Sequence, residues 1–521
     1  MDLGRRRHRA VSLALALACA ACPLPALSTA AAAGPAAAPQ VTIADGALRG
    51  QRQADGSVLF RAIPFAAPPT GARRWRPPQP PARWHDVRDA TQPAPTCAQP
   101  AIGWNDALAR RSSEDCLYVE VQTPRLDPAA RQPVMVWIHG GANVAGGADI
   151  LPSRLVEQGV VLVTVQYRLG VFGFLSLPEL SAESAQRASG HYALLDQIAA
   201  LRWVRDNIAR FGGDPARVTV FGQSAGAQDV GLLLLSPLSK GLFGAAIEHS
   251  GTAGFGLPPR SLGENEALGQ RIAQRAGADA APATAPSDAR LATLRRLPPA
   301  RLIAAAQGID VPAIDDDGYL WLQAIVDGYV IPRAPAAMLA AGEQHRVPLL
   351  LGSVAQELTY GGAGGAQARL RRDYPAQAER VLALYRDGAA HADPRYGDVA
   401  MQLATDLTFR CPAGAVAARQ AALGQPVWQY EFDLAAPGGR VTHSAELPFV
   451  FRALPLQAHG DPSVTLSRYW AAFARHGDPN ADGLPRWPRH ADDAGYLRFG
   501  EGGPVPGHRL RGEICRWLDR P

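Results

Sequence analysis

The sequence predicts a doubly wound α/β domain with a mostly parallel sheet, and three observations carry this prediction. Unbroken apolar, β-branched runs occur at residues 133–138, 160–167 and 218–221, which is typical of strands covered on both faces. Between the second and third runs, apolar side chains recur every three or four residues over residues 193–211, which predicts a helix with one buried face. Strand, helix and strand in this order make a right-handed crossover and therefore parallel neighbours.

The first 33 residues have the layout of a secretory signal peptide. Arginines at positions 5, 6, 7 and 9 precede an apolar run at residues 10–22, and small residues follow through Ala33. We therefore exclude residues 1–33 from the fold and expect an exported protein, periplasmic or secreted, in which residues 34–521 form a single domain. The paired arginines also leave a twin-arginine export route open.

Composition and charge argue against two other classes of protein. The chain is 47% hydrophobic with a mean hydropathy near zero, and no internal segment is apolar enough to span a bilayer. Removing the leader, with its four arginines and Asp2, lowers the formal charge from +5 to +2. Because no long basic stretch remains, no nucleic-acid partner is expected.

The remaining elements continue the α/β pattern. Residues 41–89 alternate short β-like runs with turn signals, and their prolines favour edge strands and loops. Residues 263–306 and 367–422 have helical spacing, and we expect them to form helical insertions packed over the carboxyl ends of the strands. Three further apolar runs continue the parallel sheet, at residues 245–249, 347–352 and 427–433.

Ser224 is the candidate nucleophile. Gly222-Gln-Ser-Ala-Gly226 fits G-x-S-x-G, in which small flanking residues let a strand turn sharply into a helix and project the serine oxygen. The buried strand before the motif and the apolar, helix-forming residues 228–235 after it supply this context. The same pattern also arises by chance in a glycine-rich chain, so the assignment needs partners.

A serine hydroxyl is a weak nucleophile, so it needs a base and an acid that orients the base. In open α/β sheets these groups follow the carboxyl ends of later strands. Glu357 comes five residues after the run at 347–352, and His443 follows the run at 427–433. The order serine, acid, histidine is associated with α/β-hydrolases. The alternatives are a solvated surface glutamate and a structural histidine.

The turn His139-Gly-Gly-Ala-Asn143 follows a buried strand and offers donors for an oxyanion. Two backbone N–H groups of this turn, together with that of Ala225 after the nucleophile, can stabilise a tetrahedral intermediate. The alternative is an ordinary tight turn, with His139 as a packed residue beneath it.

Four cysteines remain after the leader: Cys97, Cys116, Cys411 and Cys515. In an exported chain this number suggests two disulfide bonds, and the spacing leaves three pairings open. A metal site is disfavoured, because no C-x-x-C and no nearby histidine pair accompanies the cysteines. No metal or organic cofactor is expected.

The motifs together resemble the type B carboxylesterase family, which includes cholinesterases and bacterial para-nitrobenzyl esterases. The resemblance covers about residues 41–515. Besides the motif at Ser224, it rests on Phe60-Arg-Ala-Ile-Pro-Phe, Ser113-Glu-Asp-Cys-Leu-Tyr, Trp137-Ile-His-Gly-Gly-Ala, Asp196-Gln-Ile-Ala-Ala-Leu-Arg-Trp-Val and Phe211-Gly-Gly-Asp-Pro.

The resemblance implies an α/β-hydrolase fold and assigns roles to individual residues. The catalytic residues become Ser224, Glu357 and His443, and the oxyanion donors become Gly141, Ala142 and Ala225. The implied disulfide pairs are Cys97 with Cys116 and Cys411 with Cys515. The chain departs from the family at Gln223, where glutamate is common, at Ala142, where many members have glycine, and at residues 353–355 before the acid.

We therefore expect a serine esterase that hydrolyses small-molecule carboxylic esters through an acyl-enzyme. Gln223 removes a negative charge beside the nucleophile, so neutral short or medium acyl esters are the expected substrates. Trp104, in the short segment between Cys97 and Cys116, is expected to be a packing residue, and the alternative is that it lines the entrance of the site. Two alternatives stand: a hydrolase for one special ester, such as a lipid, aromatic or toxin ester, and a non-catalytic adhesion or binding module on the same fold. The oligomeric state is left open.

Overall fold

A computed structural model describes residues 37–278, 289–309, 317–358, 363–387, 393–435, 441–456, 463–491 and 493–518. The predicted signal peptide at residues 1–33 lies outside the described residues. From Ala38 onward the chain forms one unit.

An 11-stranded sheet runs through this unit in the order β18, β17, β16, β15, β12, β11, β9, β10, β8, β4, β3. All neighbours from β17 to β10 are parallel, whereas β18 at one edge and β8, β4 and β3 at the other pair antiparallel. The predicted doubly wound, mostly parallel sheet is therefore confirmed. The strands are β3 Gln51–Arg52, β4 Val58–Pro64, β8 Tyr118–Thr123, β9 Gln132–Ile138, β10 Val161–Val165, β11 Gly213–Gln223, β12 Ala245–His249, β15 Leu349–Val354, β16 Val427–Asp433, β17 Gly495–Gly500 and β18 Gly503–His508.

The winding of the sheet reverses at β9 and β11. The chain leaves β9 toward β10 on one side, then returns to β11, which pairs with the other side of β9 and leads on to β12. Where neighbouring strands send their connections in opposite directions, a crevice opens at their carboxyl ends. The loops that follow β9 and β11 therefore meet at the position where a ligand site is expected.

Three small sheets flank the main one. Of the predicted β-like region at residues 41–89, β3 and β4 join the main sheet, while three strands form a sheet of their own. The members of the small sheets are β1 Gln40–Ile43, β2 Gly46–Arg49 and β5 Arg88–Asp89, then β6 Thr96–Cys97 with β7 Ser112–Ser113, and β13 Arg260–Ser261 with β14 Ile325–Val326.

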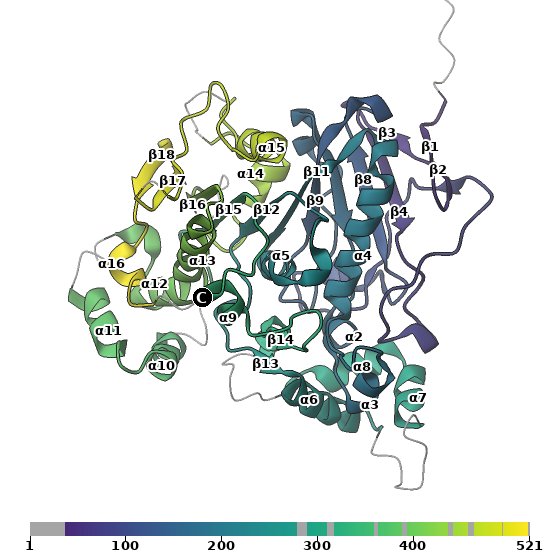
Figure 1. Cartoon of the computed structure of the whole chain (residues 1–521), viewed down its shortest axis with the longest axis horizontal. Helices are drawn as coiled ribbons and strands as arrows, with labels where there is room; N and C mark the ends of the chain where they lie inside the picture. The colour runs from purple at the N-terminus through teal and green to yellow at the C-terminus, as the bar shows by residue number, and fades with distance from the viewer. Residues whose placement is uncertain are drawn as a thin grey trace, which may run out of the picture. The chain divides into compact units, whose positions relative to one another are not determined.

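Helices cover both faces of the main sheet, because its strands are apolar on both sides. On one face α4 (Tyr192–Asn207), α5 (Ala225–Leu235) and α13 (Cys411–Ala422) pack on side chains such as Val136 and Leu351 (Figure 1). On the other face α14 (Leu447–Phe451) and α15 (Leu466–His476) join a second core rich in aromatic residues. Helix α4 ends earlier than predicted, and its last turn, Ile208–Phe211, is a 3-10 helix before Gly212.

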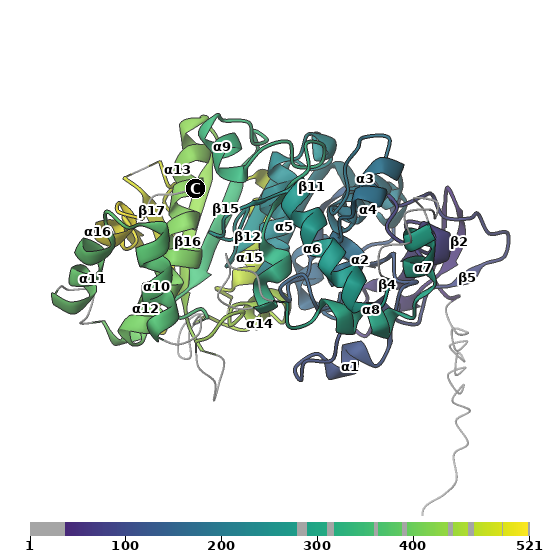
Figure 2. The same cartoon turned by 90° about the horizontal axis from the view of Figure 1, so that it is seen from below.

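The predicted helical regions at 263–306 and 367–422 are each broken into several helices. The first contains α6, α7 and α8, which lie near α2, and the second contains α10, α11, α12 and α13 (Figure 2). The remaining helices are α1 Asp106–Ala109, α2 Gly170–Phe174, α3 Pro178–Glu183, α6 Leu262–Arg275, α7 Ala289–Arg296, α8 Pro299–Ala306, α9 Pro335–Ala340, α10 Ala363–Asp373, α11 Ala378–Asp387, α12 Val399–Thr405 and α16 Gly512–Cys515. Among the described helices, none combines the length and the apolar character that crossing a membrane requires.

Disulfide bonds join Cys97 to Cys116 and Cys411 to Cys515. These are the pairs that the family resemblance implies. The first bond closes the loop that carries α1, and the second ties α16 near the end of the chain to the start of α13.

Candidate active site

Ser224 stands in a strained turn between β11 and α5. Its backbone has φ 58° and ψ −126°, a conformation that L residues rarely adopt. The turn is held by hydrogen bonds from the Ser224 N–H to the His249 carbonyl at 2.8 Å and from the Gln228 N–H to the Ser224 carbonyl at 3.0 Å. A Cβ atom on Gly222 would lie 2.3 Å from the Gly226 carbonyl oxygen, so the flanking position has to be glycine.

His443 and Glu357 form a short hydrogen bond next to this turn. The distance from His443 Nδ1 to Glu357 Oε2 is 2.5 Å, and the Glu357 side chain is fully buried. Because an ionised carboxylate only accepts, Nδ1 carries the proton, and Nε2 of the neutral ring is left with its lone pair. The pair therefore has the arrangement of a general base and its orienting acid.

The loop that carries Glu357 is held by groups that sequence reasoning missed. Glu357 Oε1 accepts from the Val354 N–H at 2.9 Å, and the Glu357 N–H donates to Thr405 Oγ1 at 3.2 Å. Fully buried Arg410, in a π-helical turn (Asp406–Arg410), donates to the Ala355 carbonyl at 2.9 Å. The sequence signal for this role was a charged residue, Arg410, within a region predicted to be a packed helix. Only the fold shows that Arg410 contacts the loop of Glu357.

Gln223, next to the nucleophile, contacts the base directly. Its Nε2 lies 3.0 Å from His443 Nε2. Since the ring nitrogen is an acceptor here, the amide is the donor. Within the described part of the chain, no hydrogen bond joins Ser224 Oγ to His443. Catalytic hydrogen bonds are often formed only once substrate is bound.

The glycine turn after β9 packs against the nucleophile turn. A Cβ atom on Gly140 would lie 2.5 Å from the Gln223 carbonyl oxygen and 3.0 Å from Ser224 Cβ. Gly141 has φ +113°, and Ala142 has φ 56°. No described residue accepts a hydrogen bond from the N–H groups of Gly141 or Ala142, and Ala225 opens helix α5 beside them. The structure thus brings the three predicted oxyanion donors to Ser224.

His139 supports this turn from below. Its ring stacks on Tyr167 with centroids 4.4 Å apart, and Nδ1 lies 2.9 Å from the Gly140 carbonyl oxygen. The Tyr167 hydroxyl donates to the His139 carbonyl at 2.6 Å. Burial lowers the pKa of His139 to about 4, so this ring is neutral at physiological pH.

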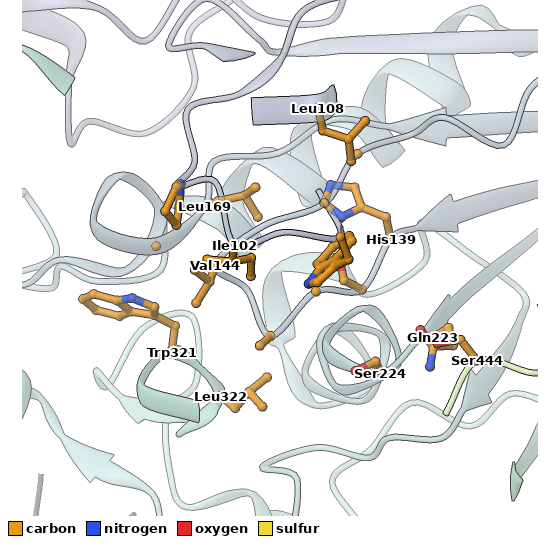
Figure 3. A pocket seen from close by; sticks show the side chains of 18 of the residues that line it. Ile102, Leu108, His139, Val144, Leu169, Gln223, Ser224, Trp321, Leu322 and Ser444 are labelled. Carbon is orange, nitrogen blue, oxygen red and sulfur yellow. Dashed lines mark hydrogen bonds between the residues drawn. The ribbon is translucent and has the colours of Figure 1, made fainter. Parts of the chain in front are cut away.

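The site opens into a cavity of about 750 Å³. Of the side chains around it, His139 and His443 are the titratable ones, and no Asp, Glu, Lys or Arg lines the cavity within the described chain. Figure 3 shows Ser224, Gln223 and Ser444 at one side and Trp321, Leu169 and Val144 at the other. The apolar lining consists mainly of Ile102, Trp104, Leu108, Trp137, Val144, Ile150, Leu169, Val171, Phe172, Ile303, Trp321, Leu322, Leu358 and Leu447.

Trp104 is not the packing residue that we expected. Its side chain is 64% exposed at the cavity mouth, beside Ile102, which is 47% exposed. A Cβ atom on Gly141 would lie 3.3 Å from Trp104 Cη2, so the indole reaches the oxyanion turn. The alternative that Trp104 lines the entrance therefore holds, because the short disulfide loop projects over the cavity instead of folding into a core.

Comparisons with known proteins match nearly the whole described chain. A model of the carboxylesterase family matches residues 37–511. Liver carboxylesterase 1 of Oryctolagus cuniculus is 34% identical over 494 residues, 85% of each chain. The fumonisin B1 esterase of Sphingopyxis macrogoltabida is 35% identical over 468 residues, 85% of this chain and 83% of that protein.

Solved structures of esterases have the same fold. A carboxylesterase of Geobacillus stearothermophilus has a TM-score of 0.74 at 31% identity, covering 92% of this chain and 99% of the other. A PNB esterase has a TM-score of 0.75 at 31% identity, with the same coverage.

Proposed function

The chain belongs to the carboxylesterase family and is a carboxylic ester hydrolase with an α/β-hydrolase fold, and on this premise we propose that Ser224, His443 and Glu357 are its catalytic triad. One observation carries the proposal: the His443 base, held by a buried Glu357 at 2.5 Å, lines the same cavity as the strained Ser224. The alternative of a non-catalytic binding module loses its support, since the chain belongs to the carboxylesterase family and its relatives are named as esterases.

The geometry supports a two-step reaction. His443 Nε2 takes the proton of Ser224 Oγ as that oxygen attacks the ester carbonyl carbon, and Glu357 stabilises the imidazolium. The N–H groups of Gly141, Ala142 and Ala225 bind the oxyanion. His443 then protonates the departing alcohol. In the second step it takes a proton from water, whose oxygen attacks the acyl carbon. The bond between this carbon and Ser224 Oγ then breaks, the carboxylic acid leaves, and His443 returns the proton to Oγ. Before each step the Gln223 amide has to break its hydrogen bond to His443 Nε2, because the lone pair of that nitrogen accepts the proton.

Substitution of the triad tests this proposal. Ser224→Ala and His443→Ala should each lower kcat by about 10⁴-fold or more, because triad members act as a unit. Ser224→Ala should also abolish labelling by a fluorophosphonate. Ser184→Ala, at a serine of the described chain that does not line the cavity, serves as the control with unchanged activity. A Ser224→Ala enzyme that retains its rate would overturn the mechanism, and an active Glu357→Gln enzyme would assign the orienting role to another carboxylate.

We also propose neutral esters with short or medium acyl chains as substrates. The cavity lining carries no carboxylate or cationic side chain among the described residues, and the amide of Gln223 stands beside the nucleophile. kcat/KM for para-nitrophenyl esters of increasing chain length should peak at short or medium acyl groups. For butyrylthiocholine it should not exceed that of an uncharged thioester of equal acyl length by more than about tenfold, or 1.4 kcal/mol.

A hydrolase for one special, bulkier ester is the second candidate. A cavity of about 750 Å³ is larger than a short acyl ester needs and suits a drug-sized molecule. One relative carries the name fumonisin B1 esterase. A panel that includes long-chain and aromatic esters separates the two candidates, because a dedicated enzyme should prefer one of them by orders of magnitude.

Export is the third part of the proposal. It is supported by the signal-like segment at residues 1–33 and by the two disulfide bonds, which form and persist in oxidising compartments. Expression of the full chain in a Gram-negative host should place a shortened, disulfide-bonded protein outside the cytoplasm. An uncleaved cytoplasmic protein with free thiols would contradict export.

A further inference from the structure

A buried polar network lies behind the oxyanion turn. Asn143, which follows Ala142, donates through Nδ2 to Asp229 Oδ1 at 3.2 Å and lies 3.4 Å from the Trp321 carbonyl oxygen. The second carboxylate oxygen of Asp229 accepts from Gln197 Nε2 at 2.6 Å. Asn143, Asp229 and Gln197 all have 0% exposure. Buried polar groups are costly without partners, so the two contacts of Asp229 favour one arrangement of Asn143 and Gln197, although Gln197 Oε1 has no partner among the described residues.

The network joins the two halves of the oxyanion site. Asn143 has a left-handed backbone with φ 58°, and its carbonyl accepts from the Gly170 N–H at 2.7 Å. Asp229 stands in α5, the helix that begins at Ala225. The hydrogen bond between Asn143 and Asp229 therefore connects the turn that carries two predicted donors with the helix that carries the third.

Among the residues that the structure describes, Asp229 has no cationic partner. Burial raises its pKa to about 7, and its contacts with Gln197 and Asn143 oppose this shift only in part. The titratable group that faces it is Tyr167, whose pKa lies well above its ordinary value, so this hydroxyl is uncharged at neutral pH. His139, which stacks on Tyr167, has a pKa of about 4 and is uncharged as well. On helix α4 the neighbouring Asp196 is paired with Arg168 at 2.7 Å.

We propose that Asp229 is a positioning residue of the oxyanion hole, whose carboxylate holds the Asn143 turn at the correct distance from Ala225. The inference rests on the proposed function of this turn. In its ionised form Asp229 accepts from both amides. Protonation turns one oxygen into a hydroxyl and weakens one of the two contacts, so the turn is held less firmly as the pH falls.

The test compares wild type with Asp229→Asn, which keeps the shape of the side chain but accepts through one oxygen only. At pH 8.5, kcat should fall by roughly tenfold while KM changes less than twofold, since oxyanion contacts strengthen in the transition state. The affinity for a trifluoromethyl ketone, which forms an oxyanion on Ser224, should fall by a similar factor. At pH 5.5 the difference in kcat should shrink to less than about threefold, because wild-type Asp229 is then protonated.

Glu248→Gln is the matched control. Glu248 is also fully buried and has a raised pKa, but it does not line the cavity. The kcat of the Glu248→Gln variant should therefore stay within twofold of wild type. Asn143→Ala provides a second route if Asp229→Asn does not fold. Asn143→Ala should lower kcat in the same way. The double variant with Asp229→Asn and Asn143→Ala should have a kcat no lower than that of the worse single variant.

The outcomes separate this inference from the proposed function. An inactive Ser224→Ala enzyme together with an unimpaired Asp229→Asn enzyme overturns the positioning role alone. A loss of thermal stability with unchanged kcat and inhibitor affinity, or a kcat ratio that does not vary with pH, overturns it too. If Ser224→Ala remains active, the proposed function itself is wrong.

Discussion

At the scale of single residues, the contact between Gln223 and His443 Nε2 bears most directly on catalysis. The amide donates to the neutral ring at 3.0 Å, whereas the glutamate common in the family at this position accepts only. A donor beside Nε2 favours the neutral imidazole, and a carboxylate favours the imidazolium. The identity of residue 223 should therefore influence the pH at which the base becomes available.

Gln223→Glu should move the acid limb of kcat/KM to higher pH, by roughly one unit. The measurement is a pH–rate profile with an uncharged para-nitrophenyl ester. Gln223→Met, similar in size but without a donor, is the control and should shift the limb less and in the same direction. Superimposable profiles for wild type and Gln223→Glu would show that the side chain does not act on His443.

At the scale of elements, strand β12 buries a carboxyl group that has no hydrogen-bond partner in the described chain. The run at residues 245–249 was predicted to continue the parallel sheet, which is what the structure shows, and every residue of the strand is buried, including Glu248. Within the described chain, neither carboxylate oxygen has a hydrogen-bond partner. Burial raises the pKa of Glu248 to about 8 from its ordinary 4.5.

Glu248→Gln should therefore change stability in a pH-dependent way. With the folded pKa raised, the stability associated with neutral Glu248 is fully present below pH 4.5 and is lost as the pH rises to about 8. The variant should thus gain Tm over wild type at pH 9 and gain little at pH 5. The exposed Glu379→Gln variant is the control with no such difference. Equal effects at both pH values would contradict the raised pKa.

At the scale of the whole molecule, the two disulfide bonds close loops of different length and hold different parts of the fold. The bond between Cys411 and Cys515 spans 104 residues and ties the end of the chain to α13, whereas the bond between Cys97 and Cys116 spans 19 residues and shapes the loop with Trp104. Loop-closure entropy assigns them about 4.7 and about 3 kcal/mol.

Replacing Cys411 and Cys515 together by serine should lower Tm more than replacing Cys97 and Cys116, because the longer loop is released. The second pair should instead raise KM for neutral esters, since Trp104 and Ile102 at the cavity mouth lose their anchor. Thermal unfolding and steady-state kinetics of both double variants measure these effects. A larger KM change in the variant that lacks Cys411 and Cys515 would contradict this division.

Local chemistry explains why much of the molecule could be predicted from the sequence. Strand and helix periodicity, the glycines around Ser224 and the order of the strands depend on neighbouring residues, and they predicted the parallel sheet and the strand-turn-helix at Ser224. Strands β8, β17 and β18 escaped prediction, because their places depend on pairing with distant strands.

By itself the sequence determined the fold class, the turn at Ser224 and the candidates Glu357 and His443, since motif spacing and hydrophobic pattern are properties of short segments. Only the tertiary structure decided what those residues touch. Gln223 and His443 are 220 positions apart, Asn143 and Asp229 are 86 apart, and Trp104 lies over the cavity because of the path of its loop. Such contacts arise when whole helices, strands and loops pack together. The pattern of residues within a short segment does not predict which distant segment it will contact.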